Sequence, residues 1–148
     1  MKKNILLLED DAATLHFMAE RLDENDFDVV PCRRIDQAKR YFDENHDDVD
    51  CIVADLNMSD EWLNEYRNES MGGMLAGWVW LRRFVYPTTP NIPTVIYSGF
   101  VDDLMKNLSA EEKTLLFRDN VACISKGVSG GIEAMIEAIN GVVSNGEK

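Results

Sequence analysis

The chain has 148 residues, of which 15 are Lys or Arg and 27 are Asp or Glu, giving a formal net charge of −12 at pH 7. This length fits one domain, and a hydrophobic content of 45% is sufficient for one core. The charge argues against a nucleic-acid-binding protein, because such proteins neutralise phosphates with Lys and Arg. We therefore expect a single domain over residues 1–148 with no nucleic-acid partner.

The first apolar segment, residues 5–8, is too short for the core of a signal peptide or for a membrane span. This predicts a cytoplasmic protein without membrane insertion. The three cysteines, Cys32, Cys51 and Cys123, lie in or beside strand-like runs and lack metal-ligand spacing. We expect them to act as small hydrophobic residues and assign them no catalytic role.

Short apolar runs alternate with amphipathic stretches along the chain. The runs predict strands at residues 5–8, 27–32, 49–54, 92–97 and 121–125. Helical periodicity predicts helices at residues 13–25, 35–42, 78–85, 101–118 and from 132 onward. Ser109 and Glu112 form a capping-box pattern that divides the fourth helical stretch, and the tail is expected to fray after Val143.

This strict alternation predicts the α/β class, with a doubly wound five-stranded parallel sheet and helices on both faces. Right-handed crossovers favour the flavodoxin-like strand order 2-1-3-4-5. In that order, ligands bind at the carboxyl ends of the strands where the order reverses, between the first and third strands.

Polar residues stand at those strand ends. They are Glu9, Asp10 and Asp11 after the first strand, Asp55 after the third, Ser98 after the fourth, and Ser125 and Lys126 after the fifth. Two carboxylates ~4 Å apart repel by roughly 4 kcal/mol at an effective dielectric of ~20, so such a cluster needs a proton or a metal ion. Oxygen ligands favour Mg²⁺, Mn²⁺ or Ca²⁺, and the nearby hydroxyl and ammonium suit a phosphoryl group.

Four segments resemble the receiver domains of two-component response regulators. They are ILLLEDD at residues 5–11, VADLNM at 53–58, TVIYSG at 94–99 and ISK at 124–126. The resemblance implies that Asp55 accepts a phosphoryl group and that Glu9, Asp10 and Asp55 hold Mg²⁺. Asp10 is the expected direct ligand of the acidic pair, and the backbone carbonyl of Asn57 completes the set.

The same resemblance implies that Ser98 bonds the phosphoryl group and that Lys126 pairs with it. A sensor histidine kinase or a histidine phosphotransfer protein would supply the phosphate. An unknown downstream protein would read the signal, and the chain would be a stand-alone switch rather than an enzyme. Asp11 precedes a helix and is expected to be its N-cap.

The chain departs from the family pattern at four places, one of which is a longer segment than usual between Ser98 and Lys126. Ser59 stands where the family has proline and opens an insertion at about residues 59–75, for which we predict a short helix hinged at Gly72 and Gly73. Gly127 replaces the proline that follows the lysine, which predicts a trans bond after Lys126. Cys123 replaces an aromatic residue, which predicts altered coupling to the protein surface.

Alternative functions remain open at this stage. A pseudo-receiver would keep the fold and bind partners without phosphorylation. A phosphatase of the haloacid-dehalogenase type is disfavoured, because Asn57 stands where those enzymes need an aspartate, and a flavodoxin lacks support because no phosphate loop follows the first strand. We assign no role to His16 or His46. The stripe of Trp62, Leu63 and Tyr66 in the insertion is either a binding surface or a local core.

Overall fold

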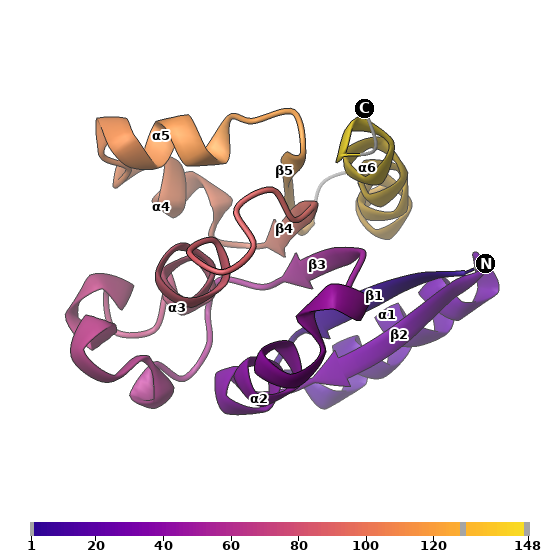
Figure 1. Cartoon of the computed structure of the whole chain (residues 1–148), viewed down its shortest axis with the longest axis horizontal. Helices are drawn as coiled ribbons and strands as arrows, with labels where there is room; N and C mark the ends of the chain where they lie inside the picture. Colours follow the sequence, from indigo (N-terminus) through magenta and orange to yellow (C-terminus); the bar gives the residue numbers. More distant parts are fainter. Residues whose placement is uncertain (1, 128–129, 147–148) are drawn as a thin grey trace.

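The computed structural model describes residues 2–127 and 130–146 of the chain. Five parallel strands form one sheet in the order β2-β1-β3-β4-β5, as the alternation predicted (Figure 1). Their bounds are Lys3–Leu8 for β1, Phe27–Cys32 for β2, Cys51–Ala54 for β3, Thr94–Ser98 for β4 and Val121–Ser125 for β5.

The described residues also form six α-helices and three other helical segments. The α-helices are α1 (Ala12–Glu24), α2 (Ile35–Asn45), α3 (Ala76–Trp80), α4 (Val101–Lys106), α5 (Ala110–Leu116) and α6 (Gly131–Gly146). The others are the 3-10 helices η1 (His46–Asp48) and η2 (Glu61–Ser70) and the π-helical turn η3 (Leu81–Val85). None of the described helices combines the length and the apolar character of a membrane span.

The helices form one layer on each face of the sheet (Figure 1). Helices α1 and α6 pack on one face, where Leu22 and Ile139 are fully buried against β1, β3 and β4. Helices α2, α3, α4 and α5 pack on the other face, where Phe42 and Trp80 are buried. Because β1, β3 and β4 are covered on both sides, their residues are apolar without alternation, as in other buried parallel strands.

Several predicted boundaries differ from the structure. Strand β4 begins at Thr94 rather than two residues earlier, because Pro93 has no N–H group to donate to the ladder. The predicted break in the fourth helical stretch is present: the Ser109 side chain accepts from the N–H of Glu112 at 3.1 Å and starts α5. Helix α6 continues to Gly146 instead of fraying after Val143, and residues 147–148 lie outside the described part.

The insertion forms η2, which is not one regular helix. Asn64 has φ 56° and ψ −125°, so the helical spacing that relates Trp62 to Tyr66 is interrupted between them. Leu63 is fully buried in the core, whereas Trp62 is 38% exposed. Tyr66 packs edge-on against the ring of Phe84, which gives this stripe the character of a local core.

Candidate functional site

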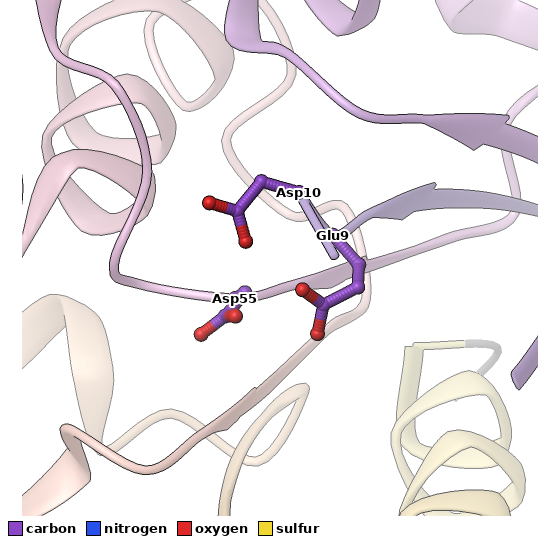
Figure 2. A group of neighbouring side chains, drawn as sticks. All are labelled: Glu9, Asp10 and Asp55. Carbon is purple, nitrogen blue, oxygen red and sulfur yellow. The ribbon is translucent and has the colours of Figure 1, made fainter. Parts of the chain in front are cut away.

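The sheet register brings the first acidic residues together. Strands β1 and β3 are neighbours, with Leu8 aligned to Ala54, so Glu9 and Asp55 follow at the same edge. The N–H of Asp55 donates to the carbonyl of Leu8 at 2.9 Å, which extends the ladder to the site. Carboxylate oxygens of Glu9, Asp10 and Asp55 all lie within 4.8 Å of one another (Figure 2).

Lys126 reaches this acidic cluster from the end of β5. Its Nζ lies 2.9 Å from Oδ2 of Asp55 and also donates to Oε1 of Glu9. Its backbone N–H donates to the carbonyl of Ser98 at 3.0 Å, which fixes the turn beside β4. One ammonium group therefore bridges two carboxylates that belong to different strands.

Glu9 is a buried carboxylate, with only 2% of its surface exposed. Burial raises its pKa and the neighbouring Asp55 adds to this, while hydrogen bonds from Lys126 and from the N–H of Asp11 oppose it; the pKa stays above the ordinary value. Burial alone would lower the pKa of Lys126, but its hydrogen bonds and attraction to the two carboxylates raise it above the usual range. The charge of Lys126 is thus favoured by the two carboxylates, and it offsets part of the cost of burying Glu9.

Asp55 is buried, and a hydrogen bond from the neighbouring backbone fixes the orientation of its carboxylate. Its Oδ1 accepts from the N–H of Leu56 at 2.7 Å, which leaves Oδ2 toward Lys126. Helix α3 starts directly against this backbone, because the N–H of Gly77 donates to the carbonyl of Leu56 at 2.9 Å. A Cβ at position 77 would lie 1.9 Å from the carbonyl oxygen of Asp55, so only glycine allows this approach.

Asp10 and Asp11 have different surroundings. Asp10 is exposed, and Figure 2 shows its carboxylate directed toward Asp55. Its carbonyl accepts from Nε and Nη2 of Arg33 at 3.3 and 3.2 Å. Asp11 is the N-cap of α1, as predicted, and accepts from the N–H and the hydroxyl of Thr14 at 2.8 and 2.6 Å. These bonds hold the loop that presents Asp10.

Two residues of the predicted set lie at the edge of the cluster. Ser98 ends β4, is fully buried, and accepts from the N–H of Phe100 at 3.1 Å. Asn57 is exposed in the loop after β3, next to Met58, whose N–H donates to the carbonyl of Gly73 at 3.0 Å. A Cβ on Gly73 would lie 2.6 Å from the carbonyl oxygen of Met58, so this glycine allows a close backbone approach.

The departures from the family pattern are visible in the structure. The described residues contain no cis peptide bond, which agrees with the trans bond predicted after Lys126, and Gly127 has a φ of 86° that favours glycine. Cys32 and Cys51 are buried and Cys123 is half-buried. Burial raises the pKa of both Cys32 and Cys123 to about 11 and raises that of Cys51 as well, so the thiols are unreactive.

The cluster fits a small divalent cation. Mg²⁺ binds oxygen ligands at about 2 Å in an octahedron, so ligand oxygens on opposite sides stand about 4 Å apart. The three carboxylates satisfy this spacing within their 4.8 Å limit and offer only oxygen. Both carboxylate oxygens of Glu9 already accept hydrogen bonds, from Asp11 and from Lys126, whereas Asp10 is exposed and accessible to a metal ion.

Sequence reasoning did not find two residues of this site. Gly77 supports the backbone of Asp55, and its signal was a glycine inside a helical pattern, which often marks close packing. Arg33 holds the loop of Asp10, but an arginine between a strand and a helix gives no such signal. The two histidines lie elsewhere: His16 pairs with Glu20 at 3.1 Å on the surface of α1, and His46 packs beside Phe42.

Comparison with known proteins gives a consistent class of fold. No family model and no curated protein sequence matches the chain. Solved structures match over nearly its whole length. A response regulator receiver domain protein from Clostridium thermocellum has a TM-score of 0.70 at 19% identity and covers 98% of this chain and 97% of its own. A CheY-like receiver domain protein from Methanospirillum hungatei has a TM-score of 0.67 at 16% identity, covering 99% and 98%.

The receiver domain of HemR from Leptospira biflexa matches with a TM-score of 0.66 at 19% identity and covers 97% of this chain and 95% of its own. These similarities span every strand of the sheet. The chain therefore has the fold of the response regulator receiver domains, as the four sequence segments implied.

Proposed function

We propose that the chain is a phosphorylation switch that accepts a phosphoryl group on Asp55 in the presence of Mg²⁺. The observation that supports this proposal is the meeting of Glu9, Asp10 and Asp55 within 4.8 Å, with Lys126 bonded to two of them. Phosphoryl transfer needs little covalent chemistry from a protein beyond a nucleophile and positive charge around the transferred group. This cluster offers both.

In this mechanism, Oδ2 of Asp55 attacks phosphorus, and the leaving group departs with the bonding electron pair. Glu9, Asp10, Asp55 and the carbonyl of Asn57 would hold Mg²⁺, which neutralises the phosphoryl oxygens when bound. Lys126 exchanges its bond to the Asp55 carboxylate for one to a phosphoryl oxygen. The Ser98 hydroxyl releases its bond from the N–H of Phe100 and donates to another phosphoryl oxygen.

The phosphoryl donor proposed for this switch is a phosphohistidine on a sensor histidine kinase or on a histidine phosphotransfer protein in the cytoplasm. Receiver domains occur within such kinases: one of the solved structures with this fold is the receiver domain of the hybrid histidine kinase CckA. The signal would then pass to a downstream protein by direct contact, with the chain acting as a switch rather than as an enzyme.

Incubation with acetyl phosphate and Mg²⁺ tests this proposal. We expect intact-protein mass spectrometry to find one added phosphoryl group, which Asp55→Asn and chelation of the metal both abolish. Asp50→Asn is the matched control, because Asp50 lies before β3 and accepts from the N–H of Asn4 at the other end of the sheet. Labelling that persists in Asp55→Asn would reject Asp55 as the acceptor.

The pseudo-receiver is the second candidate, and one observation favours it. The ammonium of Lys126 already pairs with Glu9 and Asp55, so the cluster is partly neutralised by the protein itself. A pseudo-receiver would show neither labelling nor stabilisation by Mg²⁺. A rise in melting temperature on adding millimolar Mg²⁺, absent for Asp10→Asn, would exclude it.

A further inference from the structure

A pocket of about 380 Å³ adjoins the acidic cluster on the side of α2. It is lined by Asp10, Arg33, Arg34, Gln37 and Ser59. Asp10 is common to the pocket and the cluster, so the pocket lies next to the cluster. The other walls come from the loop before α2, from the first turn of α2 and from the first residue of the insertion.

Two guanidinium groups distinguish this pocket in a chain with a net charge of −12. Arg33 bonds to the carbonyl of Asp10 and forms no ion pair of its own in the described structure, although it also attracts the carboxylate of Asp11. Arg34 is ion-paired with Asp36 at 2.9 Å, so its charge is largely balanced. Both arginines are exposed, and neither belongs to the core. Lys126 is held by Glu9 and Asp55, so Arg33 is the cation on the pocket side that is least balanced by an ion pair.

We propose that this pocket binds the anionic leaving group of a small acyl phosphate and that Arg33 favours this class among the small-molecule donors, beside the phosphohistidine of a partner protein. The inference rests on the proposed phosphorylation of Asp55. In the reaction, a bond forms between Asp55 Oδ2 and phosphorus while the bond from phosphorus to the acyl oxygen breaks. The acyl group leaves as a carboxylate with the electron pair, and no oxidant or reductant takes part.

The chemistry of the leaving group selects this donor class. A departing carboxylate develops negative charge, and a guanidinium matches a carboxylate with two parallel hydrogen bonds. A phosphoramidate or phosphohistidine loses a neutral nitrogen base after protonation, so a nearby cation stabilises it little. The volume of about 380 Å³ is at the small end of ligand pockets, which suits a short acyl group.

The test compares two small donors under the same conditions. We expect Arg33→Gln to slow phosphorylation by acetyl phosphate about tenfold, a difference of 1.36 kcal/mol in the barrier, and to leave the rate with phosphoramidate unchanged. Arg33→Lys should recover only part of the rate with acetyl phosphate, because an ammonium restores the charge but not the two parallel hydrogen bonds. Arg34→Gln should have a smaller effect, about twofold, because Asp36 already balances Arg34.

Arg40→Gln is the matched control. Arg40 is exposed on α2, the helix that follows Arg33 and Arg34, and lines a different pocket, beside Trp62 and Asn64. It removes the same charge, so it should change neither rate. A second readout needs no reaction: the unreactive analogue acetylphosphonate should shift the backbone amide NMR signals of Arg33 and Ser59 in the wild type and much less in Arg33→Gln.

Each other outcome overturns the inference in its own way. Equal slowing with both donors would mean that Arg33 acts through the loop of Asp10 and the metal site, not on the leaving group. If Arg40→Gln slowed the reaction as much as Arg33→Gln, the slowing would come from the change in net charge and not from the pocket. Absence of labelling by either donor in the wild type would reject the proposed function itself, and this inference with it.

Discussion

Gly77 stands at the first turn of α3, where the helix meets the backbone of Asp55. We predict that Gly77→Ala lowers the free energy of unfolding by about 3 kcal/mol, because a Cβ placed 1.9 Å from the Asp55 carbonyl oxygen forces the two backbones apart. Urea denaturation measures this change. A variant that still folds should also accept phosphate more slowly, since Asp55 moves with its backbone.

Gly141 provides the control for this prediction. It lies in α6 with nothing within 4 Å of a Cβ, so Gly141→Ala should stabilise the protein by about 0.5–1 kcal/mol through the lower entropy of the unfolded chain. If the two substitutions had the same effect, the close approach at Asp55 would have no energetic importance.

Lys126 is the counter-charge of two carboxylates, one of which has a raised pKa. We predict that Lys126→Met lowers the free energy of unfolding by about 2 kcal/mol at neutral pH without metal, since the buried carboxylates of Glu9 and Asp55 then lose their counter-charge. The value is below that of a fully buried pair, because the Lys126 side chain is 27% exposed. Urea denaturation across the pH range measures it.

The sign of the pH dependence follows from Glu9. Its pKa is raised by folding above 4.5, so its contribution to stability is complete below that pH and is lost as the pH rises through the folded value. Without Lys126 the pKa of Glu9 rises further. Protonation therefore removes the unfavourable buried charge of Glu9 at a higher pH in the variant than in the wild type. The deficit should therefore shrink toward acid pH. Lys113→Met, on the exposed side of α5, should show no such trend.

At the residue scale, the sequence predicted which acidic residues lie together at the sheet edge, but not which backbone contacts hold them there. Glu9, Asp10, Asp55 and Lys126 follow strands whose order is fixed by local patterns, so their meeting could be predicted. The contact of Gly77 with Asp55 depends on the angle at which α3 leaves the insertion, and no local pattern encodes that angle.

The insertion is the element that departs furthest from prediction. It is anchored by contacts that are distant in sequence: Glu69 pairs with Arg83 at 2.8 Å and with Arg82 at 3.2 Å, and Arg83 stacks on the ring of Tyr66. Within the segment, Asp60 accepts from Ser70 at 2.7 Å. The strands and the other helices were predictable because each repeats its own pattern, whereas these bonds form only after α3 and η3 are in place.

These anchors predict an ordered insertion rather than a mobile loop. Leu63→Ala should lower the free energy of unfolding by about 3 kcal/mol, since Leu63 is fully buried. Trp62→Ala, at an exposed position of the same segment, should change stability by less than about 1 kcal/mol. Urea denaturation compares the two variants. Equal costs, together with rapid uniform hydrogen exchange over residues 59–75, would show a mobile loop instead.

For the molecule as a whole, the proposed phosphorylation of Asp55 has to change a distant surface if the chain is a switch. Cys123 occupies the β5 position where the family resemblance implies an aromatic residue, and it is too small to fill space vacated by Ser98. A switch from ~1:99 to ~99:1 requires about 5.5 kcal/mol of differential stabilisation, so another element must supply part of it.

Helix α3 offers a physical connection from Asp55 to the far helices. Its first turn touches the Asp55 backbone at Gly77, and the next residue, Trp78, donates from Nε1 to Oε2 of Glu112 at 2.7 Å. Glu112 belongs to the capping box of α5, where its other carboxylate oxygen accepts from the N–H of Ser109. A small displacement of α3 therefore acts directly on the start of α5.

We predict that beryllofluoride, which mimics the aspartyl phosphate, shifts backbone amide NMR signals mainly in residues 59–75 and 101–118. Trp78→Phe retains most of the ring and removes the N–H donor, so it should reduce the shifts in α5 and leave those beside Asp55 unchanged. Coupling between Asp55 and α5 through α3 is established only if a change at either end shifts the position of α3. Trp78→Phe tests this condition. Large shifts confined to β5 and α6, with none in the two segments, would show that the signal leaves by the strand of Cys123 and that α3 has no part in it.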